Sequence, residues 1–184
     1  MNSVIFVFSL KNFNAMLNEK VETAINAQIR LEAESSQLYL AMASWAETEG
    51  LSGTANFLYT HSDEERQHML KLIRFVNERG GRAHIPELDA PPSSFDSVTE
   101  VFKSVLQHEV HVTSKINDVV HICLTEKDYT THNFMQWYVS EQLEEEALAR
   151  DIMDKLQLIG DEKAGLYLFD RDLSQLFPAN NEAK

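Results

Sequence analysis

Residues 62–69 read SDEERQHM, and they place Glu65 and His68 on the apolar face of a helical pattern. Positions on this face recur every three or four residues, which is the spacing of one side of an α-helix. The whole face reads Leu58, His61, Glu65, His68, Leu72 and Phe75. Residues three positions apart are neighbours on a helix surface, so both the carboxylate and the imidazole are expected to face the protein interior.

The same helical periodicity recurs along most of the chain. We predict four long helices and a short fifth one, over residues 17–48, 54–79, 97–125, 129–158 and 164–177. Gly80 and Gly81 give the second helix a typical C-terminal stop, and residues 97–100, SVTE, form a capping box that opens the third. Residues 80–95 are too long for a tight turn, so they are expected to cross over the bundle. The pattern therefore predicts an all-α fold, a four-helix bundle with one long crossover.

Composition narrows the possible partners. The chain has 184 residues and a net charge of -13, whereas binding to nucleic acid requires clustered Lys and Arg. Nucleic acid is therefore excluded as a partner. No apolar run approaches the roughly 20 residues of a membrane span, so a membrane is excluded as well. Cys123 is the single cysteine and cannot form an intramolecular disulfide.

The chain length suits a single domain. We assign residues 16–176 to that domain, 1–15 to an N-terminal extension outside the fold, and 177–184 to a C-terminal tail. The extension contains the short apolar run VIFVFSL, which no basic residue precedes. A signal peptide is the alternative interpretation of this run, and Met16 is an alternative natural start. We expect a cytoplasmic location.

Acidic side chains interrupt the middle of all four long apolar faces. The charged and imidazole positions are Glu32, Glu65, His68, Glu109, Glu141, Glu144 and Glu145. Each unpaired buried carboxylate costs several kcal/mol, whereas a whole domain is stable by only about 5–15 kcal/mol. Such a cluster must be protonated, paired with cationic side chains, or bound to metal. No face offers a central Lys or Arg, and Glu oxygens with one imidazole suit Fe or Mn. We therefore predict a metal centre inside the bundle.

Other polar and aromatic residues on these faces have simpler interpretations. His61 lies one heptad before His68, and we interpret it as a core residue or a support for the ligands. Tyr39 is either a core tyrosine or a hydrogen-bonding neighbour of the metals. Trp137 is interpreted as packing. Glu146 is expected to be the solvated member of the run EQLEEE.

Five segments of the chain resemble the bacterial non-haem ferritins. They are RLEAESSQLY, DEERQHM, HEVHVTSKIN, NFMQWYVSEQLEEE and GLYLFD. The resemblance covers residues 16–176 and implies a ferritin-like bundle whose short fifth helix lines a fourfold axis of a 24-subunit homo-oligomeric shell. It also implies iron storage: O2 or H2O2 oxidises Fe(II), and the shell holds the ferric mineral.

The resemblance also assigns a di-iron ferroxidase centre. Glu32, Glu65, His68 and Glu109 would form the first iron position. Glu65 and Glu109 would bridge to the second position, which Glu145 completes. The resemblance thus implies two iron ions per subunit.

Further residues around this centre follow from the same resemblance. Gln142 would lie beside the two ions, and Tyr39 matches a tyrosine next to them. A possible third iron site would use Glu64, Glu141, Glu144 and Glu145. Bacterioferritins carry a haem-ligating Met directly after the motif Glu, whereas this chain has Arg66, so we expect no haem.

Two alternatives remain open from the sequence. One is a di-iron enzyme of the rubrerythrin or oxygenase type that acts on peroxide or an organic substrate. Symmetric di-iron proteins carry two E-x-x-H motifs, and this chain has one, which disfavours that class. The other alternative is a helical scaffold whose acids line a solvated groove.

Overall fold

The computed structural model describes residues 17–160 and 162–177. These residues form five helices and no strand: α1 (Glu19–Thr48), α2 (Ser52–Glu78), α3 (Val98–Thr125), α4 (Tyr129–Ile159) and α5 (Lys163–Leu176). The predicted all-α class is confirmed, and each helix boundary lies within two residues of its predicted position. The predicted N-terminal extension, residues 1–15, lies outside the described residues, as do residues 178–184 of the predicted tail.

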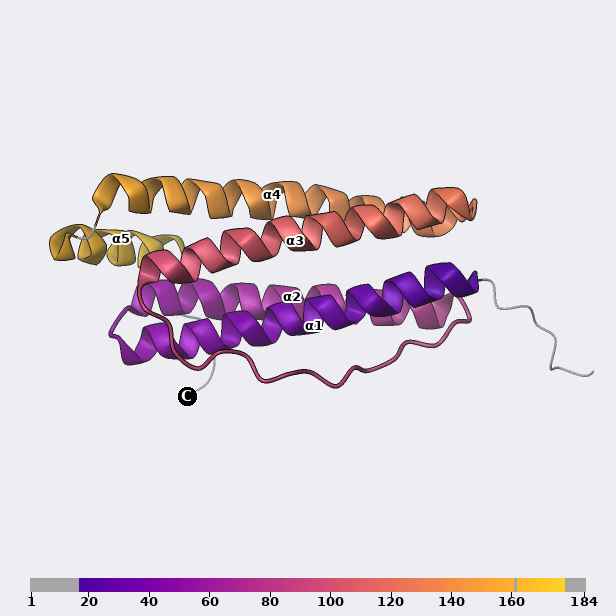
Figure 1. Ribbon diagram of the computed structural model, residues 1–184, viewed down its shortest axis with the longest axis horizontal. Helices are drawn as coiled ribbons and strands as arrows, with labels where there is room; N and C mark the ends of the chain where they lie inside the picture. The colour runs from indigo at the N-terminus through magenta and orange to yellow at the C-terminus, as the bar shows by residue number, and fades with distance from the viewer. Residues whose placement is uncertain (1–16, 161, 178–184) are drawn as a thin grey trace, which may run out of the picture.

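The four long helices pack as two pairs. α1 lies against α2, α3 lies against α4, and contacts between α1 and α3 join the pairs. The segment between α2 and α3 runs beside α1 along the length of the bundle, so the long crossover is confirmed (Figure 1). α5 packs across one end of the bundle against α2 and α4.

Side-chain caps and glycines set the helix ends. Asn18 accepts a hydrogen bond from the Lys20 amide at 2.8 Å and opens α1. Ser97 accepts from the Glu100 amide at 3.2 Å, as the capping-box pattern predicted. Gly160 follows α4 with φ of 62°, a conformation that costs other residues more than it costs glycine.

The interior contains two separate apolar clusters. One includes Met42, Phe57 and Phe102 at the α5 end of the bundle, and the other includes Ile25 and Ile116 at the far end. Along each of the four long helices, the change from one cluster to the other falls at a buried polar position. These positions include Glu32, Ser35, Ser36, His61, Ser62, Glu65, Glu109 and Gln142. A polar layer therefore crosses the middle of the bundle.

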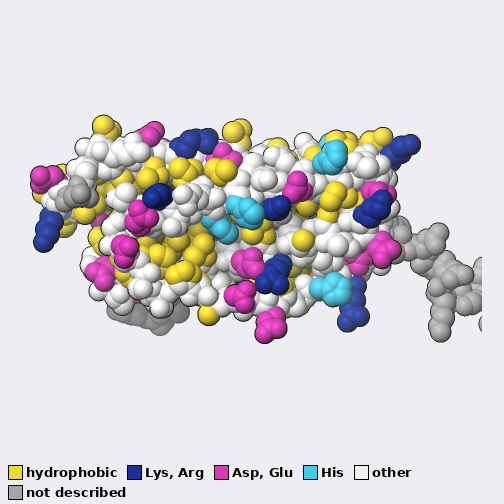
Figure 2. Space-filling model, in the orientation of Figure 1, with side chains coloured by type: hydrophobic (Ala, Val, Ile, Leu, Met, Phe, Trp, Pro, Cys, Tyr) yellow, Lys and Arg dark blue, Asp and Glu magenta, His cyan; other side chains and the backbone are white. Residues whose placement is uncertain are grey.

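The outer surface carries both signs of charge. On the face drawn in Figure 2, acidic and basic side chains are interspersed, and no basic patch forms. Within the part of the chain that the structure describes, no helix is long and apolar enough to cross a membrane.

Asp170 of α5 caps α2 in place of a residue from α2 itself. The N-cap residue of α2, Leu51, makes no side-chain cap. Instead, the Asp170 carboxylate accepts from the amides of Gly53 at 3.0 Å and Thr54 at 2.8 Å, and from the Thr54 hydroxyl at 2.9 Å. A Cβ at Gly53 would come within 1.8 Å of the Asp170 carbonyl oxygen, so only glycine permits this approach. The cap ties α5 to the bundle.

Replacing Asp170 with alanine is expected to loosen α5. The change leaves three donors without their acceptor and should lower the free energy of unfolding by about 1–3 kcal/mol. We expect a lower thermal midpoint and faster tryptic cleavage after Arg171. Asp172→Ala is the matched control, because Asp172 is exposed on the same helix and pairs with Arg171. Equal effects of the two substitutions would contradict the capping role.

Candidate metal centre

The polar layer gathers the predicted ligands from all four long helices. α1 contributes Glu32, α2 contributes Glu65 and His68, α3 contributes Glu109, and α4 contributes Gln142 and Glu145. Glu32, Glu65 and Glu109 are 1%, 4% and 2% exposed, respectively, so their carboxyl groups are shielded from bulk water. The structure thus brings together the side chains that the sequence placed at the middle of each face.

Glu32, Glu65 and His68 form the first group of candidate ligands. His68 Nδ1 lies 3.4 Å from Glu65 Oε2 and 3.9 Å from Glu32 Oε2. These two carboxylate oxygens have no hydrogen-bond partner among the described residues. The other oxygen of Glu32 accepts from Gln28 Nε2 at 2.8 Å. Buried oxygens without donors, beside an imidazole nitrogen, suit a divalent cation, so the residues fit an iron position.

Glu109 is held from two sides. The Tyr39 hydroxyl donates to Oε1, and Gln142 Nε2 donates to Oε2 at 2.5 Å. Gln142 Nε2 also donates to the Glu109 carbonyl oxygen at 3.1 Å. Tyr39 is therefore a hydrogen-bonding neighbour of the candidate ligands and also a core residue, at 1% exposed. Gln142 lies beside the centre and orients the Glu109 carboxylate.

Burial raises the pKa of every carboxyl group in the layer. The pKa of Glu65 rises to about 8, and the nearby charges of Glu109 and Glu145 also raise it. Burial raises the pKa of Glu145 to about 7 and that of Glu32 well above its ordinary value. Hydrogen bonds from Tyr39 and Gln142 partly oppose the rise at Glu109. Without a cation, the raised pKa values of Glu65 and Glu145 therefore leave these two groups partly protonated at neutral pH.

Tyr39→Phe tests the hydrogen bond to Glu109. Removing the hydroxyl leaves a buried carboxylate oxygen without its donor, so we expect a loss of about 1–3 kcal/mol in the free energy of unfolding. The matched control is Tyr59→Phe, because Tyr59 donates to Glu47 in a solvated position at 2.7 Å. The thermal midpoints of both variants at pH 7 provide the measurement. A larger loss at Tyr59 than at Tyr39 would contradict the prediction.

A second group of candidate ligands lies between α2 and α4. His61 Nε2 lies 3.6 Å from Glu145 Oε2 and 3.9 Å from Glu64 Oε2. Glu141 and Glu144 line the same pocket, but neither belongs to a close ligand group. His61 was expected to be a core residue or a support for the ligands, and its ring is buried. Its spacing of one heptad before His68 was the available signal that it faces the acids.

The prediction that Glu146 is the solvated member of the run EQLEEE is wrong. Its carboxylate accepts from the Thr113 hydroxyl at 2.6 Å and pairs with Arg150 at 2.8 Å, which links α4 to α3. These hydrogen bonds lower the pKa of Glu146.

Trp137 packs against the rings of His68 and Tyr138, as predicted. Lys71 Nζ also lies 3.0 Å from the centre of the Trp137 ring.

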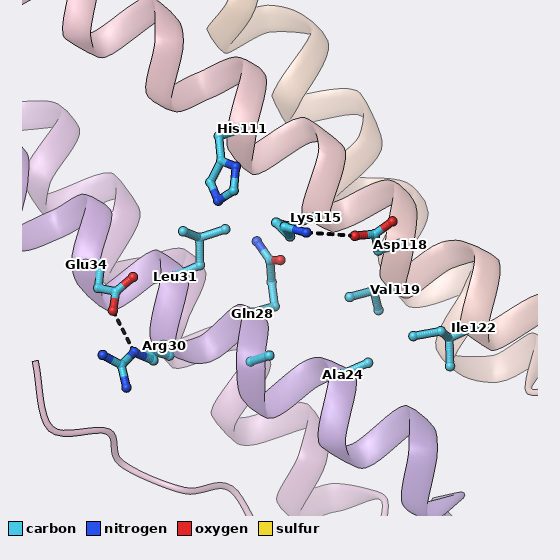
Figure 3. Close-up of a pocket in the computed structure, with 11 residues that line it drawn as sticks. Ala24, Gln28, Arg30, Leu31, Glu34, His111, Lys115, Asp118, Val119 and Ile122 are labelled. Carbon is cyan, nitrogen blue, oxygen red and sulfur yellow. Dashed lines mark hydrogen bonds and ion pairs between the residues drawn. The ribbon is translucent and has the colours of Figure 1, made fainter.

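A separate pocket lies between α1 and α3, and only Gln28 among its lining residues bonds a buried carboxyl, that of Glu32. Its charged side chains already have partners, since Arg30 bonds Glu34 at 2.6 Å and Lys115 bonds Asp118 at 3.0 Å (Figure 3). The walls are otherwise largely apolar, with Leu31 among them. We therefore assign the metal chemistry to the polar layer.

Comparison with known proteins agrees with this geometry. Residues 22–159 match the family model described as a ferritin-like domain. The chain belongs to the ferritin-like family. A bacterial non-heme ferritin-like protein of Haemophilus influenzae is 47% identical, over 88% of this chain and 98% of that protein. The bacterial non-heme ferritin of Campylobacter jejuni is 44% identical, over 88% of this chain and 96% of its own length.

Solved ferritin structures share the fold. The open pore ferritin of Archaeoglobus fulgidus superposes with a TM-score of 0.85 and 46% identity, covering 87% of this chain and 98% of that ferritin. The predicted family and the predicted ferritin-like bundle are therefore confirmed. Membership of the ferritin family supports a role in iron storage.

Proposed function

We propose that this protein oxidises Fe(II) at the polar layer and stores the Fe(III) product. The observation that carries the proposal is the pair of buried oxygens, Glu32 Oε2 and Glu65 Oε2, that face His68 without any donor among the described residues. Iron is the substrate of this reaction. Hard carboxylate oxygens favour the higher oxidation state, so the ligand set itself drives Fe(II) toward Fe(III).

Two Fe(II) ions would occupy the layer together. Glu32 and His68 would hold the first ion, Glu65 and Glu109 would bridge, and Glu145 would complete the second position. Entry of the ions displaces the protons that the raised pKa values retain on these carboxyls. Two Fe(II) ions supply two electrons, which reduce O2 and two protons to H2O2, or H2O2 and two protons to water. Gln142 and Tyr39 would keep the Glu109 carboxylate in place during the change of charge.

The storage function requires an enclosed space, which a single bundle does not supply. We therefore propose a homo-oligomeric shell of 24 subunits. A shell of this 21.1 kDa chain would elute near roughly 500 kDa, whereas a dimeric di-iron enzyme would elute near a tenth of that mass. Size-exclusion chromatography separates the two functions, and elution as a dimer would contradict the shell.

The oxidation step is tested by titration with Fe(II). Apoprotein is loaded with Fe(II) under argon and then exposed to O2, and the formation of Fe(III) is followed by absorbance. We expect rapid oxidation of about two Fe(II) per chain, followed by slower accumulation of mineral. Oxidation no faster than that of free Fe(II) in buffer would contradict the proposal. Tight binding of less than about one iron per chain would favour the scaffold alternative.

A further inference from the structure

The Trp137 ring lies against one of the candidate iron ligands. The indole of Trp137 and the imidazole of His68 meet edge to face, with ring centroids 5.2 Å apart. The same indole meets the Tyr138 ring at 4.9 Å, and it is half-buried on α4. Indole is among the side-chain groups that lose an electron most easily. Trp137 is therefore placed to reduce an oxidant that forms at the His68 position.

A cation covers the same indole. Lys71 Nζ lies 3.0 Å from the centre of the Trp137 ring, well within the range of a cation–π interaction. Lys71 follows His68 by three residues on α2, so the two side chains share one side of that helix. Partial burial lowers the pKa of Lys71, and the nearby Glu141 carboxylate opposes that shift by favouring the ammonium form. The indole is thus in contact with a ligand of the centre and with an ammonium group.

The Lys71 ammonium opposes oxidation of the indole. Removing an electron from the Trp137 ring leaves a positive charge in that ring, and two positive charges at so short a distance repel each other. The ammonium also stabilises the neutral ring, because the face of an indole is electron-rich. Both effects make the oxidised ring less favourable, so the cation protects the ring by its charge.

The proposed reaction creates a need for this protection. Reduction of H2O2 to two waters consumes two electrons and two protons, and two Fe(II) ions supply both electrons. In a subunit that holds a single Fe(II), the ion supplies one electron and the second is taken from the protein. The Trp137 indole can supply that electron together with its N–H proton. H2O2, Fe(II), the indole and one solvent proton then give two waters, Fe(III) and an indolyl radical.

We propose that Lys71 is a specificity-determining residue, which keeps Trp137 from donating electrons and so reserves H2O2 for pairs of Fe(II) ions. The inference rests on the proposed function, because oxidation of Fe(II) beside His68 supplies the reaction that the indole would enter. Trp45 provides an internal reference, since it is the other tryptophan of the chain, is also half-buried and packs on Phe95 with centroids 5.6 Å apart.

Peptide mass spectrometry after a peroxide reaction tests the proposal. Apoprotein of the wild type, Lys71→Leu and Lys71→Arg is loaded with about one Fe(II) per chain and mixed with H2O2, and oxidised Trp137 is measured relative to oxidised Trp45. We expect Lys71→Leu to raise this ratio about threefold or more and Lys71→Arg to keep it near the wild-type value. Lys115→Leu is the matched control, because Lys115 pairs with Asp118 on the surface of α3.

Two results would overturn the proposal. Equal ratios in the wild type and Lys71→Leu would show that the cation does not protect the indole. Equal increases in Lys71→Leu and Lys71→Arg would show that the shape of the side chain, and not its charge, protects the ring. Circular dichroism verifies that each variant is folded.

A measurement without iron separates this inference from the proposed function. Azide radicals generated by pulse radiolysis oxidise tryptophan in the metal-free proteins, and Lys71→Leu should raise the ratio of oxidised Trp137 to oxidised Trp45 there as well. A charge-dependent ratio in this experiment, without rapid Fe(II) oxidation by the wild type, would refute the proposed function alone. Rapid Fe(II) oxidation, with ratios that do not depend on residue 71 in either experiment, would refute this inference alone.

Discussion

Glu65→Gln is expected to slow the initial oxidation of Fe(II) by about a hundredfold or more and, at the same time, to stabilise the protein stripped of metal. Substitutions of residues that merely support a metal ligand typically cost 10–100-fold in affinity or activity, and loss of a proposed bridging ligand should cost at least as much. Stopped-flow absorbance after mixing with Fe(II) and O2 measures this first effect.

The gain in stability follows from the burial of Glu65. Its side chain is almost fully enclosed, and one of its oxygens has no hydrogen-bond partner among the described residues. Glutamine has nearly the same shape and carries no charge, and its amide can donate toward the unpaired Glu32 oxygen. We expect the free energy of unfolding at pH 8 to rise by about 1–3 kcal/mol. The thermal midpoint without metal provides the second measurement.

Glu146→Gln is the matched control for Glu65→Gln. Glu146 is half-buried on α4, but Thr113 and Arg150 bond its carboxylate. Neutralising it should lower stability slightly and leave iron oxidation unchanged. If Glu65→Gln raises the free energy of unfolding and Glu146→Gln lowers it, the Glu65 carboxylate binds metal at a cost in stability. A loss of stability in Glu65→Gln would contradict this interpretation.

The protein stripped of metal is expected to lose stability as the pH rises from about 5 to about 8. Burial raises the pKa of Glu65 to about 8 and that of Glu145 to about 7, with repulsion from neighbouring carboxylates adding to both shifts. In the unfolded chain, both groups release their protons near their ordinary pKa of about 4.3. Between these limits the folded state binds more protons, so stability falls with rising pH by up to about 1.4 kcal/mol per pH unit for each group.

Thermal midpoints at pH 5, 6.5 and 8, at fixed protein concentration, measure this dependence. We expect the midpoint to fall across the series in the metal-free protein. Anaerobic Fe(II) should restore it most strongly at pH 8, where fewer protons remain on these carboxyls for the cation to displace. A midpoint that rises with pH in the metal-free protein would show that the acids of the polar layer are solvated or paired in solution. In the Glu65→Gln variant, the thermal midpoint without metal should depend less on pH.

The helices and the polar layer were predictable because they depend on local patterns. Helical periodicity, the SVTE cap and the glycines at 80 and 160 determine the helix boundaries. The acids lie in phase with the apolar positions, so the convergence of Glu32, Glu65 and Glu109 followed from the apolar faces of three helices, each read independently. Such features require no knowledge of which helices are neighbours.

The features that could not be predicted from the sequence depend on contacts between helices. Glu146 is four residues from Arg150, but its bond to Thr113 depends on how α4 is rotated against α3. Asp170 caps α2 across more than a hundred residues of sequence, so no local pattern could indicate that pairing. The direction of the His61 ring likewise depends on Phe57 and on the register between α2 and α4. Periodicity predicts which side chains share a face of a helix, whereas their hydrogen-bond partners on other helices depend on tertiary packing.

The division of the interior into two apolar clusters has a consequence for engineering. Ile25 and Phe102 belong to different clusters, and the polar layer lies between them. Distant sites that share no partner contribute additively to stability. Substitutions at the end remote from α5 and at the end beside α5 are therefore expected to add in their effects on stability, so the two ends can be redesigned for heat resistance one at a time.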